Sequence, residues 1–285
     1  MVPTRVHPAC LIPTVLLLSG PAWCEDAISS FDDDWAVSPF VNYNMGSFSG
    51  FDSREYRTDK PFDVGVGLRY KWLSAAGSVS TSFSEPFDLW SFDIDAASYF
   101  DSMYVRAYFK RYRNMAVVED AVDSSLDIHS SGIMAMFVHN SENHSLGSVV
   151  KLEKRQNVSS GSLLYGFGVF HSSLYSAAGT IERYKDRLHL LYFGPCVGYS
   201  HTWVFRNRVF LNVALVHVAS PGVDLSTKRW LYIPQAEPQV VVGHHHDSWS
   251  MNFRVMNLSK FLIWNKSDVD NLTLISWTWM FSQRF

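Results

Sequence analysis

The clearest pattern along the chain is a strict alternation of apolar and polar residues. From Phe62 to Trp72 the sequence reads FDVGVGLRYKW, so that every second residue is apolar and the residues between are Asp, Gly, Arg or Lys. The segment from Trp277 to Phe285 alternates in a similar way. Successive side chains of a strand point to opposite faces, so this period of two predicts strands with one apolar face. No segment of helical length shows a convincing 3.6-residue period, and the sequence therefore predicts an all-β protein.

Thirteen segments are candidate strands, namely Val37–Phe48, Phe62–Trp72, Ser74–Phe83, Trp90–Ala97, Val105–Lys110, Asp127–His139, Leu146–Arg155, Gly161–His171, Leu188–Phe205, Val209–Ala219, Gln239–His245, Ser248–Leu258 and Trp277–Phe285. A closed antiparallel barrel whose two ends lie on one side needs an even number of strands. Thirteen is odd, so one segment is missing or wrongly assigned. Assigning up and down directions to the strands inward from both ends of the chain places this error between Asn157 and Leu188. We therefore expect about 12 strands, with about 10 to 14 as the accepted range.

Several features favour a transmembrane, antiparallel up-and-down β-barrel over a soluble protein. Many candidate strands are longer than the five or six residues typical of soluble strands, and a tilted spanning strand needs about nine to eleven. Aromatic residues gather near strand ends, where the aromatic girdles of such barrels lie. Short links alternate with longer polar connections, as is typical of outer-membrane barrels. The longer connections are Ser49–Lys60, Met115–Leu126, Ser220–Pro238 and Ser259–Asp270. The alternative is a soluble sandwich or lipocalin-like barrel, because alternation alone does not say whether the apolar face points in or out.

The first 24 residues are expected to be a secretory signal peptide. Arg5 is followed by the short apolar stretch Ala9–Leu18, and small residues precede a cut before Glu25. A lipoprotein signal at Cys24 is a poorer match because Trp23 stands where a small residue is expected. Residues 25–285 then form a single barrel domain with Cys196 as its one cysteine, so no internal disulfide is expected.

Composition excludes two other classes of protein. The formal net charge is −3, whereas a nucleic-acid-binding protein needs a basic surface to neutralise phosphates. Beyond the N-terminal segment there is no run of about 18 apolar residues, so a bundle of transmembrane helices is excluded.

A set of ordered motifs gives a more specific indication. They are GVGLRYKWLS (65–74), FDSMYVRAYFKRY (100–112), RQNVSSGSLLYG (155–166), GPCVGYSHTWVF (194–205) and HHHDSWSMNFRV (244–255). In this order they resemble a family of bacterial outer-membrane proteins known as domain of unknown function 4421, over roughly residues 35–285. The resemblance implies a barrel in the outer membrane of a Gram-negative-type cell, and it implies no activity and no functional residues. The His244-His245 pair departs from the Tyr-Asn usual in the family.

The inward-facing charges are the first candidate site. They are predicted to line the lumen: Arg69, Lys71, Asp93, Asp95, Arg106, Lys110, Lys151, Glu153 and Arg155. One interpretation is a constriction that selects a polar solute. The other, which the near balance of signs favours, is a closed lumen filled by a network of salt bridges.

A second candidate is the pair His171 and Ser173, which share one strand face. Some barrel lipid hydrolases place a His and a Ser in this way, so that the imidazole deprotonates the nucleophile. No orienting acid or amide is evident, and a plain strand end is the simpler explanation. The third candidate, His244-His245-His246, points its imidazoles to alternate faces, so a metal site is not expected there. No cofactor is expected.

The function that follows is non-enzymatic: a structural protein or a passive, porin-like pore for small polar solutes. The alternatives are a lipid hydrolase at His171 and Ser173, or a binding module in which the loops Met115–Leu126 and Ser220–Pro238 present a cluster such as Trp230-Leu231-Tyr232. Expected partners are outer-membrane lipids and the barrel-assembly machinery, which would read the strand ending at Phe285. No nucleic acid is expected as a partner.

Overall fold

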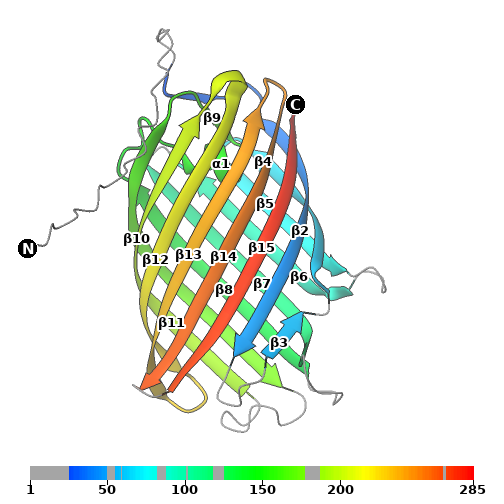
Figure 1. Ribbon diagram of the computed structural model, residues 1–285, viewed down its shortest axis with the longest axis vertical. Coiled ribbons are helices and arrows are strands. Elements are labelled where there is room, and N and C mark those ends of the chain that lie inside the picture. Colours follow the sequence, from blue (N-terminus) through cyan, green and yellow to red (C-terminus); the bar gives the residue numbers. More distant parts are fainter. Residues whose placement is uncertain are drawn as a thin grey trace, which may run out of the picture.

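Twelve antiparallel strands close into a barrel in the computed structural model (Figure 1), which describes residues 26–49, 55–58, 60–81, 88–100, 102–117, 125–176, 187–265 and 268–285. The barrel strands are β2 (Trp35–Ser49), β4 (Phe62–Tyr70), β5 (Leu73–Thr81), β6 (Asp88–Tyr99), β7 (Met103–Val117), β8 (Ser125–Val138), β10 (Ser160–Ser176), β11 (Arg187–Val204), β12 (Val209–Asp224), β13 (Arg229–His245), β14 (Trp249–Asn265) and β15 (Asp268–Arg284). Each pairs with its neighbour in the chain, and β15 closes the barrel on β2, with Trp277 opposite Tyr43. The predicted fold class and the expected 12 strands are confirmed.

Two short strands and a helix complete the fold. β3 (Glu55–Thr58) pairs with both β2 and β7. β1 (Ile28–Ser30) pairs with β9 (Lys154–Gln156) in a separate two-stranded sheet. A five-residue helix, α1 (Leu146–Val150), precedes β9. Within the described residues, no helix is long and apolar enough to cross a membrane.

The apolar face of the alternating strands points outward. On β4, for example, Val64, Val66 and Leu68 have exposed fractions of 42 to 52%, whereas Asp63 and Arg69 are buried in the interior. An outer wall of this kind would leave a large apolar area in contact with water, which costs about 25 cal/mol of free energy per Å². Acyl chains remove that penalty, and closure leaves no unpaired strand edge in the hydrocarbon. The soluble alternatives, in which apolar faces pack inward, do not fit.

The two ends of the barrel differ. The start of β2 and the end of β15 lie at the upper end in Figure 1, which we call the terminal end, and the opposite end is the loop end. Short connections such as Lys71-Trp72 and His246-Asp247-Ser248 lie at the terminal end. In outer-membrane barrels the short turns face the periplasm. The signal-peptide segment, residues 1–24, lies outside the described residues.

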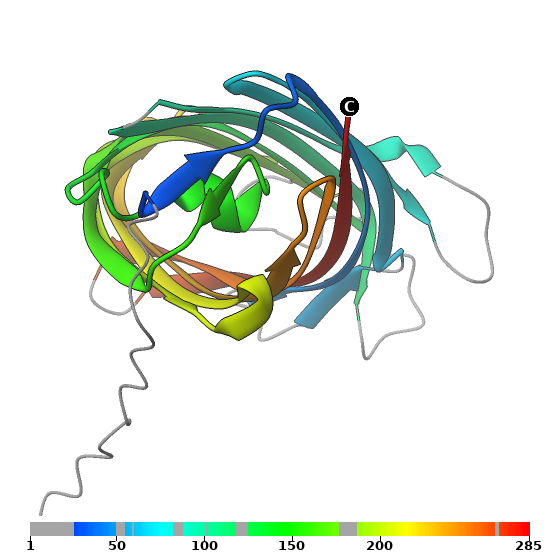
Figure 2. The same ribbon diagram turned by 90° about the horizontal axis from the view of Figure 1, so that it is seen from above.

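The strand predicted at Leu146–Arg155 is wrong, and it accounts for the odd strand count. This segment contains α1 and β9, and it lies across the terminal end of the lumen (Figure 2). Ser145 caps the helix by accepting a hydrogen bond from Ser148 N, as N-cap serines commonly do. Leu146 and Val149 are three residues apart and both buried, a helical spacing hidden in a segment read as alternating. The parity error therefore lies here and not between Asn157 and Leu188.

The inner wall of β11 to β13 is largely apolar toward the loop end, where the sequence predicted a polar lumen throughout. Leu188, Leu190, Tyr192 and Ile233 point inward and are at most 1% exposed. Strands β11 to β14 carry apolar residues on both faces here, so alternation weakens. For the same reason Ser220–Pro238 is not a loop: β12 continues to Asp224 and β13 begins at Arg229.

Candidate functional site

Charged side chains from β6, β7 and the segment inside the lumen meet at one point of the inner wall. Asp95 accepts hydrogen bonds from Arg106 Nε at 2.5 Å and from Lys151 Nζ at 2.7 Å. Asp93 pairs with Lys110, which lies directly opposite on β7. These five predicted lumen charges thus lie together as two ion-paired groups. A compensated network of this kind is a structural contact rather than an open cation or anion filter.

The remaining predicted lumen charges lie closer to the terminal end. Arg69 points inward and donates to the Asp33 carbonyl at 2.9 Å, and Glu153 is buried. Arg155 lies on β9 and pairs with the exposed Asp247 at 3.1 Å. Lys71 is not a lumen residue: it lies in the β4–β5 turn with a φ of 53° and a half-exposed side chain. A tight turn interrupts the alternation at this position, which is why the alternating pattern placed it wrongly.

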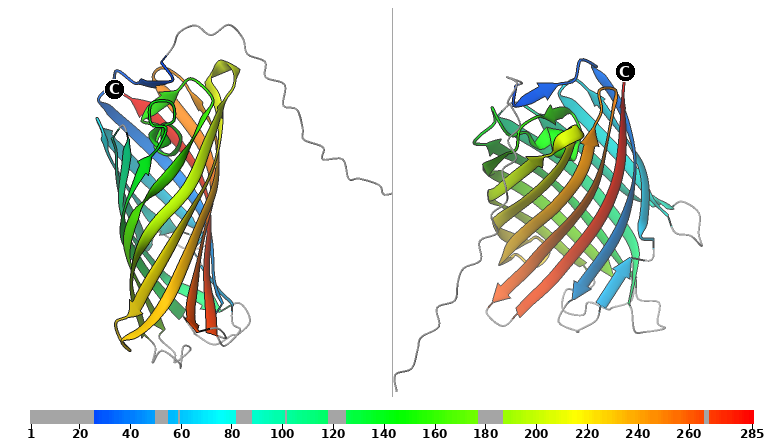
Figure 3. Two further views of the ribbon diagram at one scale, coloured as in Figure 1. Left: turned by 90° about the vertical axis from the view of Figure 1, so that its left-hand side faces the viewer. Right: turned by 45° about the horizontal axis from the view of Figure 1, so that its top comes forward.

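Residues 139–159, which we call the plug, fill the terminal end of the lumen (Figures 2 and 3). Val149 and Leu152 are each 1% exposed and pack in one apolar cluster with Phe40, Phe210, Val241 and Met280 of the wall. Asn252 on β14 donates to the Val149 carbonyl at 2.8 Å. The plug is therefore held by this cluster, by Leu146 in the larger apolar cluster of the wall, by hydrogen bonds such as that from Asn252, and by the ion pairs Lys151–Asp95 and Arg155–Asp247, with no covalent link.

Burial holds two titratable groups of the plug in their neutral forms. Burial raises the pKa of Glu153 to about 8, against weaker lowering by Ser74 and nearby cations. Burial lowers the pKa of His144 to about 4. Both groups are neutral near pH 7, as buried groups without a strong counter-charge tend to be. Docking of the plug is therefore coupled to proton binding.

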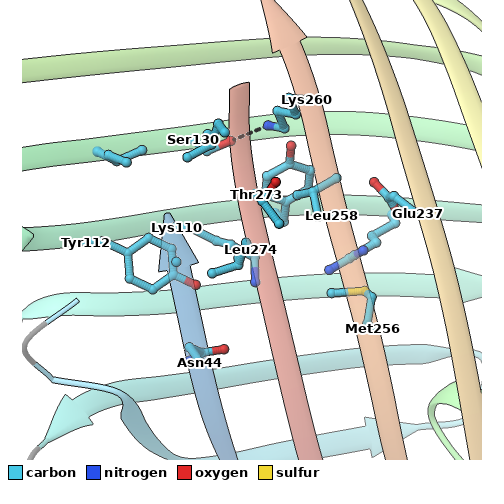
Figure 4. Close-up of a pocket in the computed structure, with 15 residues that line it drawn as sticks. Asn44, Lys110, Tyr112, Ser130, Glu237, Met256, Leu258, Lys260, Thr273 and Leu274 are labelled. Carbon is cyan, nitrogen blue, oxygen red and sulfur yellow. Dashed lines mark hydrogen bonds between the residues drawn. The ribbon is translucent and has the colours of Figure 1, made fainter. Parts of the chain in front are cut away.

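A cavity of about 60 Å³ lies in the lumen on the loop side of the charged network (Figure 4). Its wall is mostly apolar and comes from β2, β7, β8, β13, β14 and β15: Asn44, Gly46, Arg106, Tyr108, Lys110, Tyr112, Ile128, Ser130, Glu237, Met256, Leu258, Lys260, Leu272, Thr273 and Leu274. Two further cavities of about 60 and 50 Å³ lie between it and the plug. Arg106 and Met256 line all three cavities. The lumen thus contains a row of small spaces on the loop side of the plug.

Lys260 is the most buried cation of this cavity, with an exposed fraction of 3%. Its Nζ donates to Tyr192 Oη at 3.0 Å and lies 3.4 Å from Ser130 Oγ. Ser172 Oγ in turn lies 3.1 Å from Tyr192 Oη. These partners are neutral hydroxyl groups, and no ion pair joins Lys260 to a carboxylate within the described part of the chain.

Sequence reasoning missed Lys260 and Glu237 because both fell in or beside segments predicted as loops, Ser259–Asp270 and Ser220–Pro238. A charged residue inside an otherwise apolar inward row, as in Met256, Leu258, Lys260 and Leu262, is the signal that was available. Once β14 is extended to Asn265, the period of two places Lys260 in the lumen.

The predicted pair His171 and Ser173 lies on the outer wall of β10, near the loop end. Ser173 Oγ is 3.2 Å from His171 Nε2 and 3.0 Å from Nδ1 of His189 on β11. Ser173 is itself 1% exposed. The structure thus places two imidazoles against one serine, and His189 was not foreseen because only residues of one strand were compared.

The three consecutive histidines lie at the end of β13 and in the following turn. His245 points into the barrel, 3.0 Å from Ser250 Oγ, whereas His244 and His246 each contact the Trp249 ring. Across the residues that the structure describes, no group of three or more His, Cys, Asp or Glu side chains is placed to hold a metal ion. The Trp230-Leu231-Tyr232 cluster lies within β13 and not in a loop. Part of the other proposed binding loop, residues 118–124, lies outside the described residues.

The closed strand order, the apolar outer wall and the filled lumen define an outer-membrane-type β-barrel with a plugged interior. The chain matches the model of a family described as "Domain of unknown function (DUF4421)" over residues 35–276. It belongs to this family.

Comparison with solved structures finds remote likeness to other outer-membrane proteins. An outer membrane channel from Pseudomonas putida F1 has 7% identity and a TM-score of 0.39, with 90% of this chain and 97% of that chain covered. The P. putida toluene transporter TodX has 7% identity and a TM-score of 0.30, with 92% and 91% covered. A Pseudomonas aeruginosa FadL homologue has 8% identity and a TM-score of 0.31, with 89% and 91% covered. No curated protein matches the chain in sequence.

Proposed function

We propose that the protein is a gated passage for small solutes across the bacterial outer membrane, with the plug as its gate. The observation that carries this proposal is that the plug lies across the terminal end of a lumen in which cavities remain. A barrel with a purely structural role has no need of space between its plug and its loop end. All contacts between the plug and the wall are non-covalent, namely ion pairs, hydrogen bonds and apolar packing, so the plug can leave the lumen without breaking a covalent bond.

The test is to lock the plug to the wall. Cysteines replacing Asp95 and Lys151, whose side chains meet at 2.7 Å, are joined by a short, reducible thiol cross-linker. Cys196 is buried and does not compete for the reagent. We expect conductance steps in planar bilayers from the uncross-linked variant, loss of them after cross-linking, and recovery on reduction.

The control is the same cross-link between cysteines at Asp34 and Lys71, two exposed residues 4.0 Å apart and outside the plug. It should leave conductance unchanged. Correctly folded protein that stays silent both with and without the plug cross-link would overturn the proposal.

A second candidate function is hydrolysis of outer-membrane lipids at Ser173. It is supported by the two imidazoles within hydrogen-bond distance of Ser173 Oγ, on a wall that faces lipid. An imidazole in this position takes the hydroxyl proton as the oxygen attacks an ester carbonyl. Ser173→Ala should abolish deacylation of lipids in reconstituted membranes, while His171→Gln should reduce it. An unchanged lipid profile in the wild-type protein would remove this candidate.

Export and assembly complete the proposal. Residues 1–24 would be removed as a signal peptide, and β15, which runs to Arg284 beside the exposed Phe285, would be read by the barrel-assembly machinery. Deletion of Phe285 should then lower the amount of folded barrel in the outer membrane without changing export, as measured by fractionation and by gel mobility before and after heating.

A further inference from the structure

The cavity of Figure 4 is lined by one carboxylate, Glu237, and by three cations, Arg106, Lys110 and Lys260. Glu237 enters it from β13; its carboxylate interacts electrostatically with Arg106 but makes no direct hydrogen bond or ion pair among the described residues. Lys260 enters it from β14 and is bound only to neutral hydroxyl groups. A buried cation without an ion-pair partner is costly, so Lys260 is unusual for a wall with a purely structural role.

The sheet register fixes how far apart the backbones of Glu237 and Lys260 are. Ala236 lies opposite Ser259 and Gln235 lies opposite Lys260, so Glu237 and Lys260 are diagonal neighbours across β13 and β14. Diagonal neighbours on one face are about 7–8 Å apart. Lys260 extends toward Tyr192 and Ser130 and away from Glu237, which keeps the two groups from pairing.

Both charges have hydrogen-bonding capacity to spare. An ammonium group has three donors, of which Lys260 uses two, and a carboxylate has about four acceptor positions, of which Glu237 uses none. Beside them, Gln235 is 2% exposed and its Nε2 has no partner within the described residues. A ligand that carries both an ammonium and a carboxylate group would satisfy all three side chains.

The remaining lining of the cavity favours a ligand with an apolar side chain. Leu258, Leu272 and Leu274 face the space between the two charges and offer it no hydrogen bond. Met256 separates the cavity from its two neighbours, because it lines all three. Methionine side chains repack readily, and a rotamer change of Met256 would join two cavities and roughly double the available space.

We propose that this cavity binds an apolar α-amino acid. Its ammonium group would lie on Glu237, its carboxylate on Lys260 with Gln235 beside it, and its side chain against the three leucines. An apolar carboxylate without an amino group fits less well, because it would bring a second negative charge close to Glu237 without giving that carboxylate a hydrogen-bond donor. The inference rests on the proposed function only in that the amino acid is the solute that reaches the lumen.

The test uses leucine and two analogues that each lack one charge, 4-methylpentanoate and 3-methylbutylamine. Binding to the full chain in detergent is measured by calorimetry. We expect leucine to bind at least tenfold more tightly than either analogue. Glu237→Gln should weaken the binding of leucine tenfold or more, so that leucine and 4-methylpentanoate bind with equal affinity. Glu142→Gln, at an exposed turn residue, should leave both affinities unchanged.

Lys260→Met should weaken both leucine and 4-methylpentanoate, and Lys260→Arg should restore part of the affinity, which separates loss of charge from loss of fold. Equal binding of leucine and 4-methylpentanoate to the wild-type protein would overturn the proposal in favour of a plain anion site. Absence of leucine binding to folded protein would also overturn it. Conductance without leucine binding contradicts only this inference, and leucine binding by a non-conducting barrel contradicts only the proposed function.

Discussion

Lys151 Nζ lies 2.7 Å from Asp95 Oδ1, and this contact joins the plug to the barrel wall. Asp95 simultaneously binds Arg106 of the neighbouring strand, so a single carboxylate is shared by two cations. Removing it leaves both cations without the carboxylate that binds them.

We therefore expect Asp95→Asn to release the plug. Leaving a buried partner unpaired costs roughly 3–5 kcal/mol, which would raise the population of the undocked plug by about 100-fold or more. Hydrogen exchange of residues 146–156 measures this directly. Lys71→Gln removes a cation from an exposed pair and should leave exchange unchanged. Equal protection of the plug in Asp95→Asn and wild type would show that the ion pair does not hold it.

Docking of the plug should weaken as the pH rises through the pKa of Glu153. The folded pKa of about 8 lies above the ordinary value of 4.5, so the docked plug holds a proton that the free plug loses. Stability is then complete below about pH 4.5 and falls progressively up to about pH 8. Glu153→Gln should remove this fall, with hydrogen exchange of the plug as the measurement. A wild-type plug equally protected at pH 5 and pH 8 would contradict the assignment.

Protonation of His144 should act in the opposite direction at low pH. Its folded pKa of about 4 lies below the ordinary value of 6.5, so the free plug binds the proton more readily. Docking should therefore weaken as the pH falls from about 6.5 toward 4. In a Glu153→Gln background, which removes the opposing titration, His144→Asn should make exchange of the plug insensitive to pH in this range, and an unchanged acid response in that double variant would show that another group is responsible.

Gly132 should tolerate no side chain. A Cβ atom there would lie 2.5 Å from the Phe170 ring and 2.9 Å from the Tyr108 ring. Overpacking of this kind costs about 1–3 kcal/mol, so Gly132→Ala should lower the urea concentration at which the reconstituted barrel unfolds. Gly77→Ala is the matched control, since its nearest atom would be 3.9 Å away. Equal loss of stability in both variants would contradict the packing argument.

The outer wall supplies a test of the membrane-facing orientation. Val169, near the middle of β10, is 47% exposed on the outside of the barrel. Val169→Arg should destabilise folding into lipid vesicles by about 2–4 kcal/mol, the usual cost of a cation near the bilayer midplane. Val169→Leu should be neutral. Normal insertion of the arginine variant would indicate that this position does not contact acyl chains.

The sequence could predict the barrel because each strand repeats the same local signal. An alternating segment such as Phe62–Tyr70 carries its orientation in itself, since one face must meet lipid and the other must not. The plug could not be predicted in this way. Leu146 to Val150 has too few residues to distinguish a period of two from one of 3.6, and only the even strand number required by closure pointed to an error.

The candidate site was predicted less well, for a related physical reason. The pairs Asp93–Lys110 and Asp95–Arg106 come from adjacent strands joined by a tight turn, so their neighbourhood follows from the sequence. Lys260 meets Tyr192 and Ser130 across strands that are far apart in the chain. Contacts of that kind depend on the number and register of all the strands between them, which alternation alone does not give.

The pairing of β1 with β9 has a mechanical consequence. Ile28 to Ser30 pair edge to edge with Lys154 to Gln156, so β1 is joined directly to the plug. A pulling force applied just before β1 would be transmitted through the β1–β9 pair to the lumen before it acted on any barrel strand. A force applied through a tag or tethered bead at that end would therefore act on the plug, whereas the same force at the carboxyl end would act on the barrel wall through β15.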